Sequence, residues 1–242
     1  MNEKHLAELA VRAARSGRTQ YTRFLDPAEE REAEAIGRRA GANARFFGGY
    51  DGAERRMAAY WSDEEPEDAP LTALELSWNA KFVSCAHRDL LGAVMALGIE
   101  RDATGDIRMG TEPGVAYLFC TDEMADYLCA SLESAGRAKL RVRRAESVSI
   151  APPEGTRAHI TVQTLRLDAV AAAGYKLSRG EAQKLIAAGL MKLDHIPETR
   201  SDAAVREGSL LSARGYGRLL VEKVSGETRK GRIALEVMRY GK

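Results

Sequence analysis

Hydrophobic residues recur at different spacings in three stretches of the chain. In the first stretch, residues 1–66, apolar positions repeat every three or four residues, which predicts helices. One helix start is signalled by Asp26, the proline after it and Glu29. Asp51 with Glu54 has the form of a second capping box and predicts a further helix. Phe46-Phe47 suggest one buried strand, and Gly48-Gly49 a turn after it. We therefore expect an N-terminal helical region over residues 1–66.

The middle stretch, residues 67–150, alternates between strand and helix patterns. It follows an acidic, proline-bearing segment at residues 62–70 that we interpret as an exposed linker. The predicted strands cover residues 71–78, 105–110, 114–120 and 138–148, and the predicted helices cover residues 87–98 and 121–136. This β-α-β-β-α-β order is that of a ferredoxin-like domain, which we expect over residues 67–150.

The last stretch, residues 157–242, begins after a second linker, "APPEGTR". A helix is predicted at residues 164–174, with Thr164 as its cap. The next helix begins at Ser178, which forms a capping box with Glu181, and a glycine ends it. The two predicted helices follow each other closely.

Short strands are predicted after these helices, up to residue 240. Ile233, Leu235 and Val237 alternate toward one face, and a turn is predicted at Ser225-Gly226. The chain is therefore expected to be α+β, with an N-terminal helical segment, a central ferredoxin-like domain and a C-terminal helix pair with a small β-sheet.

Charge is unevenly distributed, although the whole chain carries only +1. Residues 157–242 hold 16 lysines and arginines against 9 acids, whereas residues 1–156 hold 20 against 26. A basic surplus gathered in one third of a chain favours a polyanionic partner for that third. No apolar run approaches the roughly 20 residues of a membrane span, so we expect a cytoplasmic protein with no membrane partner.

Residues typical of catalytic, metal or cofactor sites occur only in isolation. The three cysteines are far apart and the four histidines show no ligand spacing, so neither a disulfide nor a metal site is expected. "HRDL" at residues 87–90 matches the start of a kinase catalytic loop, but Val94 stands where that loop needs asparagine. Tyr117 and Phe119 share a strand face, as base-stacking aromatics do in RNA-recognition domains, but core packing is the simpler interpretation. We expect no enzyme activity, no cofactor and no small-molecule substrate.

Two predicted helix starts in the basic third carry an arginine. Arg179 is the first residue of its helix, and Arg166 lies near the start of the preceding one. A cation at this positive end costs a few tenths to about 1 kcal/mol. Free amides and a guanidinium can together bind a phosphate, so we interpret the pair as an RNA backbone site. Further RNA-binding candidates are the nearby basic, hydroxyl and aromatic residues Lys176, Ser178, Lys184, Arg214, Tyr216, Arg218, Arg229, Lys230 and Arg232.

Residues 164–213 resemble the RNA-binding domain named after ribosomal small-subunit protein four, called the S-four domain below. The pattern consists of an RLD opening, SR-x-x-A, a helix ending in glycine and a later glycine turn. The matching residues are Arg166, Leu167, Asp168, Ser178, Arg179, Ala182, Gly189 and Gly208. Two departures concern turns: Asp194-His195 stands where Asn-Gly is usual, and Ser209 replaces an aspartate.

The chain as a whole is similar to the bacterial YlmH family. The shared blocks are "FLDPAEEREAE", "ARFFGGYDGAERR", "HRDLLGAVMALGIERDATGDI" and "TDEMADYL", followed by "RGYGR" and "GETRKGR". The resemblance implies a non-enzymatic RNA-binding protein that associates with rRNA of the large ribosomal subunit, and with peptidyl-tRNA as a further partner, in ribosome-associated quality control.

Two alternatives to this function stay open. S-four domains are often joined to RNA-modifying enzymes, so the protein could be an rRNA-modification factor. The family has also been linked to cell division through genomic neighbourhood, which would suit an adaptor working through protein contacts.

Overall fold

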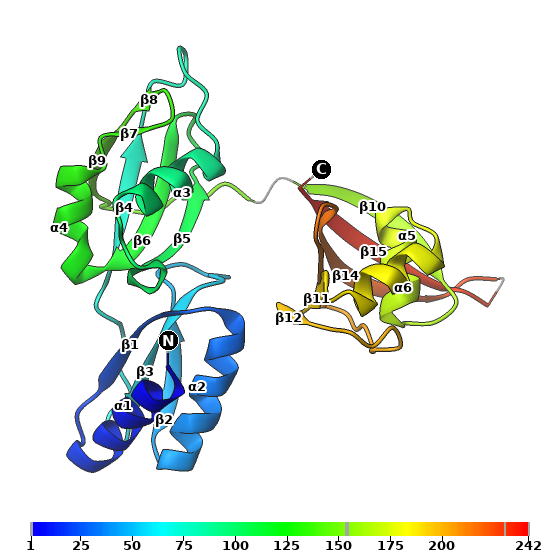
Figure 1. Cartoon of the computed structure of the whole chain (residues 1–242), viewed down its shortest axis with the longest axis horizontal. Helices are drawn as coiled ribbons and strands as arrows, with labels where there is room; N and C mark the ends of the chain where they lie inside the picture. The colour runs from blue at the N-terminus through cyan, green and yellow to red at the C-terminus, as the bar shows by residue number, and fades with distance from the viewer. Residues whose placement is uncertain (1, 153–154, 230, 242) are drawn as a thin grey trace. The chain divides into compact units, whose positions relative to one another are not determined.

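The structure, a computed structural model, describes residues 2–152, 155–229 and 231–241. It is α+β, as predicted, and it divides into two compact units, Met1–Pro152 and Pro153–Lys242 (Figure 1). Within the described residues, no helix combines the length and the apolar character that crossing a membrane requires.

The first part of unit 1 is a three-stranded antiparallel sheet covered by two helices. Its elements are α1 (Glu3–Ser16), β1 (Gln20–Leu25), α2 (Pro27–Ala40), β2 (Asn43–Phe47) and β3 (Arg56–Trp61), with strand order β1-β3-β2. The helices bury Leu6 and Ile36 against Leu25 and Tyr60 of the sheet. The expectation of a helical region is therefore only half right: the strand predicted at Phe46-Phe47 is present as β2, and β1 and β3 were not predicted.

The capping signals of this part had different outcomes. The Asp26 box is present, since its carboxylate accepts the Ala28 and Glu29 amides, both at 2.9 Å. The helix predicted from Asp51 is wrong. The Asp106 carboxylate, distant in sequence, instead accepts the Glu54 amide at 2.7 Å and fixes this segment as a loop that leads into β3.

The second part of unit 1 is the predicted ferredoxin-like arrangement. Its elements are β4 (Leu71–Ser77), α3 (His87–Ala96), the 3-10 helix η1 (Arg101–Ala103), β5 (Thr104–Met109), β6 (Val115–Thr121), α4 (Asp122–Ser131), the short hairpin β7 (Ser134–Ala135) and β8 (Ala138–Lys139), and β9 (Arg141–Arg144). The antiparallel strand order β5-β6-β4-β9 is that of the split β-α-β unit. Asp89 caps α3 by accepting the Ala86 amide at 2.9 Å. Helix α4 is shorter than predicted, because it ends at Ser131 and the β7–β8 hairpin follows.

One face of this four-stranded sheet is covered by the first part of unit 1. Tyr117 and Phe119 are buried there against Phe24 of β1, and Phe119 stacks on Tyr50 with ring centroids 4.9 Å apart. Gly49 has φ of +83°, and a Cβ added to it would lie 2.4 Å from Phe119 Cδ1. The glycines of "FFGGY" thus permit close packing, and the core interpretation of the two aromatics is confirmed.

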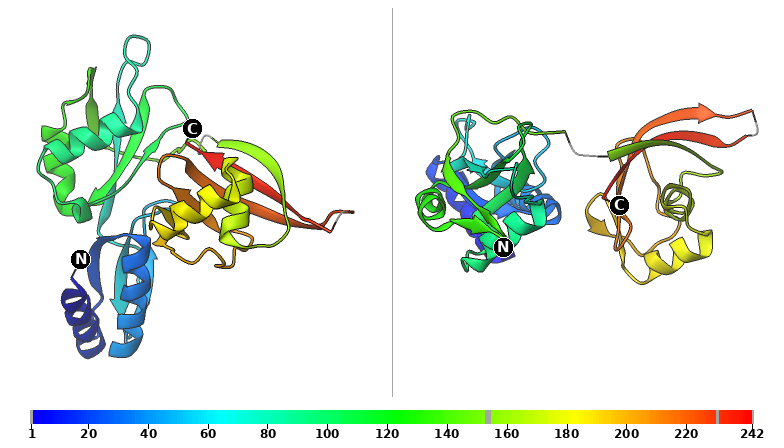
Figure 2. Two further views of the ribbon diagram at one scale, coloured as in Figure 1. Left: turned by 45° about the vertical axis from the view of Figure 1, so that its right-hand side comes forward. Right: turned by 90° about the horizontal axis from the view of Figure 1, so that it is seen from above.

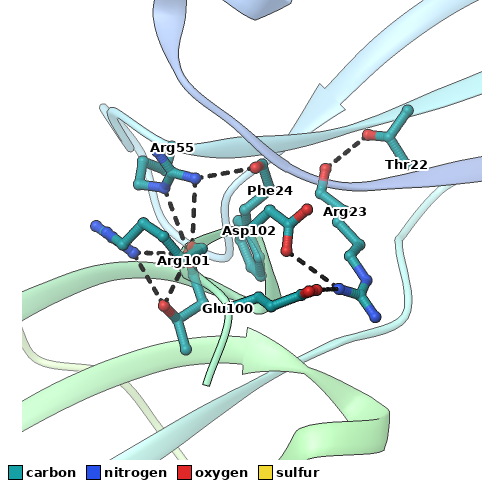
Figure 3. A network of polar contacts seen from close by, with 8 residues as sticks. Thr22, Arg23, Phe24, Arg55, Glu100, Arg101 and Asp102 are labelled. Carbon is teal, nitrogen blue, oxygen red and sulfur yellow. Dashed lines mark hydrogen bonds and ion pairs between the residues drawn. The ribbon is translucent and has the colours of Figure 1, made fainter. Parts of the chain in front are cut away.

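Two arginines, Arg55 and Arg23, join the two parts of unit 1, as Figure 3 shows. Arg55 donates to the carbonyls of Phe24 and Arg101, at 3.0 and 3.3 Å, and so connects β1 with η1. Arg23 forms an ion pair with Asp102 at 3.1 Å on the other side of β1. These contacts explain why the two parts form one compact unit.

Unit 2 packs two helices on a six-stranded sheet. Its elements are β10 (Gly155–Val162), α5 (Leu167–Tyr175), α6 (Arg179–Ala187), β11 (Met191–Leu193), β12 (Ile196–Pro197), β13 (Leu210–Ala213), β14 (Gly217–Glu227) and β15 (Ile233–Tyr240), with strand order β10-β15-β14-β13-β11-β12. Leu235 and Val237 are buried, as their alternation predicts. The β14–β15 hairpin runs on past α5 and α6 before it turns (Figures 1 and 2).

Two details of unit 2 differ from the prediction. The sequence predicted a linker where β10 begins. In the structure, β10 is instead an edge strand that pairs with β15 along its whole length. The predicted turn at Ser225-Gly226 is wrong, because β14 continues to Glu227. The chain turns instead where the Thr228 amide donates to the Arg232 carbonyl at 2.7 Å.

The residues that depart from the S-four pattern, at positions 194, 195 and 209, are compatible with its turns. Asp194 and His195 both have positive φ, 49° and 70°, as the loop of a two-residue hairpin requires. The Asp194 carboxylate also accepts the Leu210 amide at 2.8 Å and lies 3.5 Å from the Ser209 hydroxyl. Ser209, which follows the turn at Gly208, thus contacts the Asp194-His195 turn.

Candidate nucleic-acid interface

Helix α5 begins later than predicted, and its first amides are occupied. Arg166 is the N-cap residue rather than a residue inside the helix. The Leu167 and Asp168 amides donate to the carbonyls of Ala203 and Ser201, at 2.9 and 3.0 Å. The prediction that free amides at this end would bind phosphate is therefore wrong, because the protein's own backbone takes them.

Helix α6 begins as predicted. The Ser178 hydroxyl accepts the Glu181 amide at 3.2 Å, and the Glu181 carboxylate accepts the Ser178 amide at 2.8 Å. Ser178 therefore acts as a cap. In the part of the chain that the structure describes, no acceptor binds the amides of Arg179 and Gly180, so this helix end keeps exposed donors.

The two arginines converge on one carboxylate. Arg179 places Nε 3.1 Å from Asp168 Oδ2, and Arg166 places Nε 3.2 Å from Oδ1. Each guanidinium also directs Nη2 at the other oxygen, at 3.4 Å. The Gln183 amide adds a third donor, 2.9 Å from Oδ2. The Asp168 side chain is completely buried beneath these donors.

The arrangement fixes the charge of Asp168. Burial by itself would raise the pKa of this carboxyl, but hydrogen bonds from Gln183, Arg179 and Arg166 outweigh burial and lower the pKa to about 2. Asp168 is therefore ionised at neutral pH. Its charge offsets the cost of an arginine at the start of α6, which explains that unfavourable placement.

Both guanidiniums remain accessible after binding Asp168. The side chains of Arg166 and Arg179 are 41% and 51% exposed. Each uses Nε and Nη2 on the carboxylate, and Nη1 has no partner among the described residues. Two cations share one anion, so the cluster keeps a net positive charge and oriented donors, which suits a phosphate.

A second group of predicted residues gathers at the other end of α5. Tyr175 donates its hydroxyl to the Leu211 carbonyl at 2.9 Å, and the Tyr216 ring lies against it with centroids 6.0 Å apart. Lys176 follows Tyr175 at the end of α5, and Arg214 is exposed beside Tyr216 in the β13–β14 turn. These residues form an exposed basic and aromatic corner.

The other predicted residues are spread further. Arg229 and Arg232 lie in the β14–β15 turn, and Lys230 lies outside the described residues. Since β14 has 11 residues, these arginines lie roughly 35 Å along the strand from the Tyr216 corner. Arg218 is exposed near the start of β14, and Lys184 is exposed on α6. The predicted residues of the basic third thus form one cluster around Asp168 and two separate groups, one at the Tyr216 corner and one at the β14–β15 turn.

Sequence reasoning missed Asp168 and Gln183 as members of the site. Asp168 was noted only within the RLD tripeptide. An acid between two arginines that each start a helix is the signal that could have suggested a shared acceptor. Gln183 gave no such signal, because its role depends on the angle between α5 and α6.

The cysteines and the residue types that bind metals show no cluster among the described residues. The cysteines are free, with Cys85 and Cys120 buried. No cluster of three or more histidine, cysteine or acidic side chains in the described ranges could hold a metal ion.

Comparison with known proteins relates the chain to a family model, a curated protein and a solved structure. Residues 65–149 match the family model described as "Putative RNA-binding domain in YlmH". The chain is 36% identical over 218 residues to "Ribosome-associated protein quality control protein P2" of Bacillus subtilis, covering 88% of this chain and 84% of that protein. A solved structure titled "Cell division protein ylmH from Streptococcus pneumoniae" aligns with a TM-score of 0.49 and 22% identity, covering 59% of this chain and 87% of that one. On the extent and identity of the match to the Bacillus subtilis protein and on the family model, this chain belongs to the YlmH family.

Proposed function

We propose that this protein is a non-enzymatic RNA-binding protein that associates with rRNA of the large ribosomal subunit through backbone contacts. It acts in ribosome-associated quality control of stalled peptidyl-tRNA, with tRNA backbone as a further contact. The name of the Bacillus subtilis relative and the description of the matched family model support this role.

The observation that carries the proposal is the pair of half-exposed guanidiniums held by Asp168. Lysines and arginines on flexible surfaces lose much rotamer freedom when they bind phosphate. Arg166 and Arg179 are already oriented by two hydrogen bonds each, so less of that freedom remains to be lost. Their net positive charge attracts the phosphate backbone without reading its sequence.

Co-sedimentation with purified large subunits tests the proposal. Charge reversal of Arg179 would place an acid against the buried Asp168 carboxylate, so the appropriate variant replaces Arg166 and Arg179 with glutamine. We expect wild-type protein in the subunit fractions at moderate salt and the double variant near the top of the gradient.

The matched control is Arg157→Gln. Arg157 lies on edge strand β10, is 77% exposed and is paired with Glu222, so its replacement also removes an arginine charge from unit 2. The control should sediment like wild type. Equal retention of the double variant and the control would refute the role given to the two guanidiniums.

A further inference from the structure

In the domain that the family model matches, one face of the sheet is closed to RNA. Its sheet face, where related folds stack bases, is closed, because Tyr117 and Phe119 are buried beneath the first part of unit 1. Any RNA contact of this domain must therefore use another surface.

One exposed surface of the domain combines an aromatic ring with unpaired cations. Beside the ends of β4 and β9 lies a hollow of about 760 Å³, called the β4–β9 hollow below. Trp78, Lys81, Lys139 and Arg141 line it, and no acidic residue is among its lining residues. Phe82 follows directly in the chain, and its 83% exposure is the greatest of the large hydrophobic residues described.

The exposed ring is presented by an ordered turn. The Asn79 carbonyl accepts the amides of Phe82 and Val83, both at 3.2 Å, and the Asn79 side chain accepts the Lys81 amide at 3.2 Å. Val83 packs on the domain core, whereas Phe82 stays outside it. The turn is held against the sheet by the Trp78 amide, which donates to the Gly114 carbonyl at 2.9 Å. The backbone at Phe82 is therefore ordered, and the Phe82 ring is exposed.

The cations of the hollow differ from the last two arginines of strand β9. Arg143 binds Glu75 through two contacts of 3.0 and 2.9 Å, and Arg144 binds Asp126 at 2.9 Å. Lys81, Lys139 and Arg141 form no ion pair with any residue that the structure describes. The positive charge of the hollow is thus not neutralised by the protein.

We propose that the β4–β9 hollow and Phe82 form a second RNA site that takes a single-stranded segment. A base stacks on the Phe82 ring, and Lys81, Lys139 and Arg141 neutralise the adjoining phosphates. Single-stranded RNA fits because its unpaired bases can turn outward and stack on an exposed ring. The inference rests on the proposed RNA-binding function and extends it from unit 2 to unit 1.

The test uses the full chain with Arg166→Gln and Arg179→Gln, so that the cluster in unit 2 does not dominate binding. The probe is a fluorescein-labelled ten-nucleotide oligouridine followed by anisotropy. We expect salt-dependent binding by this parent protein. Adding Phe82→Ala should weaken it about 5- to 100-fold, as expected for losing one base–aromatic stack.

Neutralising the cations gives a readout that lost packing alone would not produce. Replacing Lys81, Lys139 and Arg141 with glutamine should lower the slope of log affinity against log salt by about 2, since each single-strand phosphate contact contributes about 0.7. Two control variants, one on helix α4 and one on strand β9, remove the same kinds of side chain outside the hollow. Tyr127→Ala removes another exposed ring, and Arg144→Gln removes another arginine of β9. Both should bind like the parent.

A tryptophan signal reports the site directly. Trp61→Phe leaves Trp78, in the hollow, as the only tryptophan. Its emission should change on adding oligouridine and saturate with the affinity that anisotropy gives. The inference is overturned if the parent does not bind, if Phe82→Ala binds within twofold of it, or if Trp78 emission stays constant. These outcomes leave the co-sedimentation test of the proposed function unaffected.

Discussion

At the scale of single residues, Asp168 determines whether the two arginines form a site. Without it, Arg166 and Arg179 would be two separate solvated cations, each worth little. With it, both guanidiniums are oriented by a buried charge. The sequence predicted the two cations because each stands at a recognisable helix start. It did not predict their acceptor, since the meeting of residues 166, 168 and 179 depends on tertiary packing.

The ionised state of Asp168 predicts a pH effect on stability. The pKa of Asp168 is lowered to about 2 by its donors, against a usual value near 3.9. Its contribution is therefore fully present above about pH 4 and is lost as the pH falls toward 2. In the wild-type protein, we expect unit 2 to have a higher free energy of unfolding than in Asp168→Asn. This difference should shrink by about 2 kcal/mol as the pH falls across this range.

Urea unfolding followed by resolved backbone NMR signals of α5 measures this difference. Asp202→Asn serves as control, because Asp202 is an exposed acid of unit 2 that does not contact Asp168. A wild-type advantage that stays constant from pH 5 to pH 2 would contradict the assigned ionisation.

The aromatic corner at Tyr216 predicts an effect on binding that does not depend on salt. Tyr216 is 38% exposed and contacts Tyr175, so its ring is available for stacking. Tyr216→Ala should weaken binding to large subunits by roughly 5-fold or more without changing the salt slope, because it removes no charge. Filter binding at three salt concentrations checks both parts. A reduced slope would contradict a role for Tyr216 limited to stacking.

At the scale of elements, local signals succeeded where packing agreed with them. The Asp26 and Ser178 capping boxes start helices as predicted. The helix predicted after Asp51 failed because Asp106, more than 50 residues away, binds the Glu54 amide and favours a loop. Strand β10 was missed because its start lies beside two prolines that indicate a linker, although residues 158, 160 and 162 alternate inward.

The loop between β2 and β3 yields a stability prediction. Gly49 has positive φ and no room for a Cβ beside Phe119, whereas Gly52 has positive φ with open space around it. Gly52→Ala should cost about 1 kcal/mol from backbone strain, and Gly49→Ala should cost about 2–4 kcal/mol because overpacking adds to that strain. Unfolding followed by the fluorescence of Trp61 and Trp78 measures both. Equal costs would show that Phe119 moves aside freely.

At the scale of the whole molecule, each unit has hydrophobic clusters of its own. Both tryptophans, Trp61 and Trp78, belong to unit 1. We therefore expect Asp168→Asn to leave the tryptophan unfolding midpoint unchanged while it shifts the NMR transition of unit 2. Equal shifts of both transitions would show that the units unfold together.

The central claim is that Arg166 and Arg179, held by Asp168, bind nucleic-acid backbone. The most direct test is the affinity for purified large subunits at a series of salt concentrations. The account predicts a steep loss of affinity with salt for wild type and Arg157→Gln, and a log–log slope smaller by about 2 for the Arg166→Gln and Arg179→Gln double variant. A double variant with the wild-type slope would contradict it.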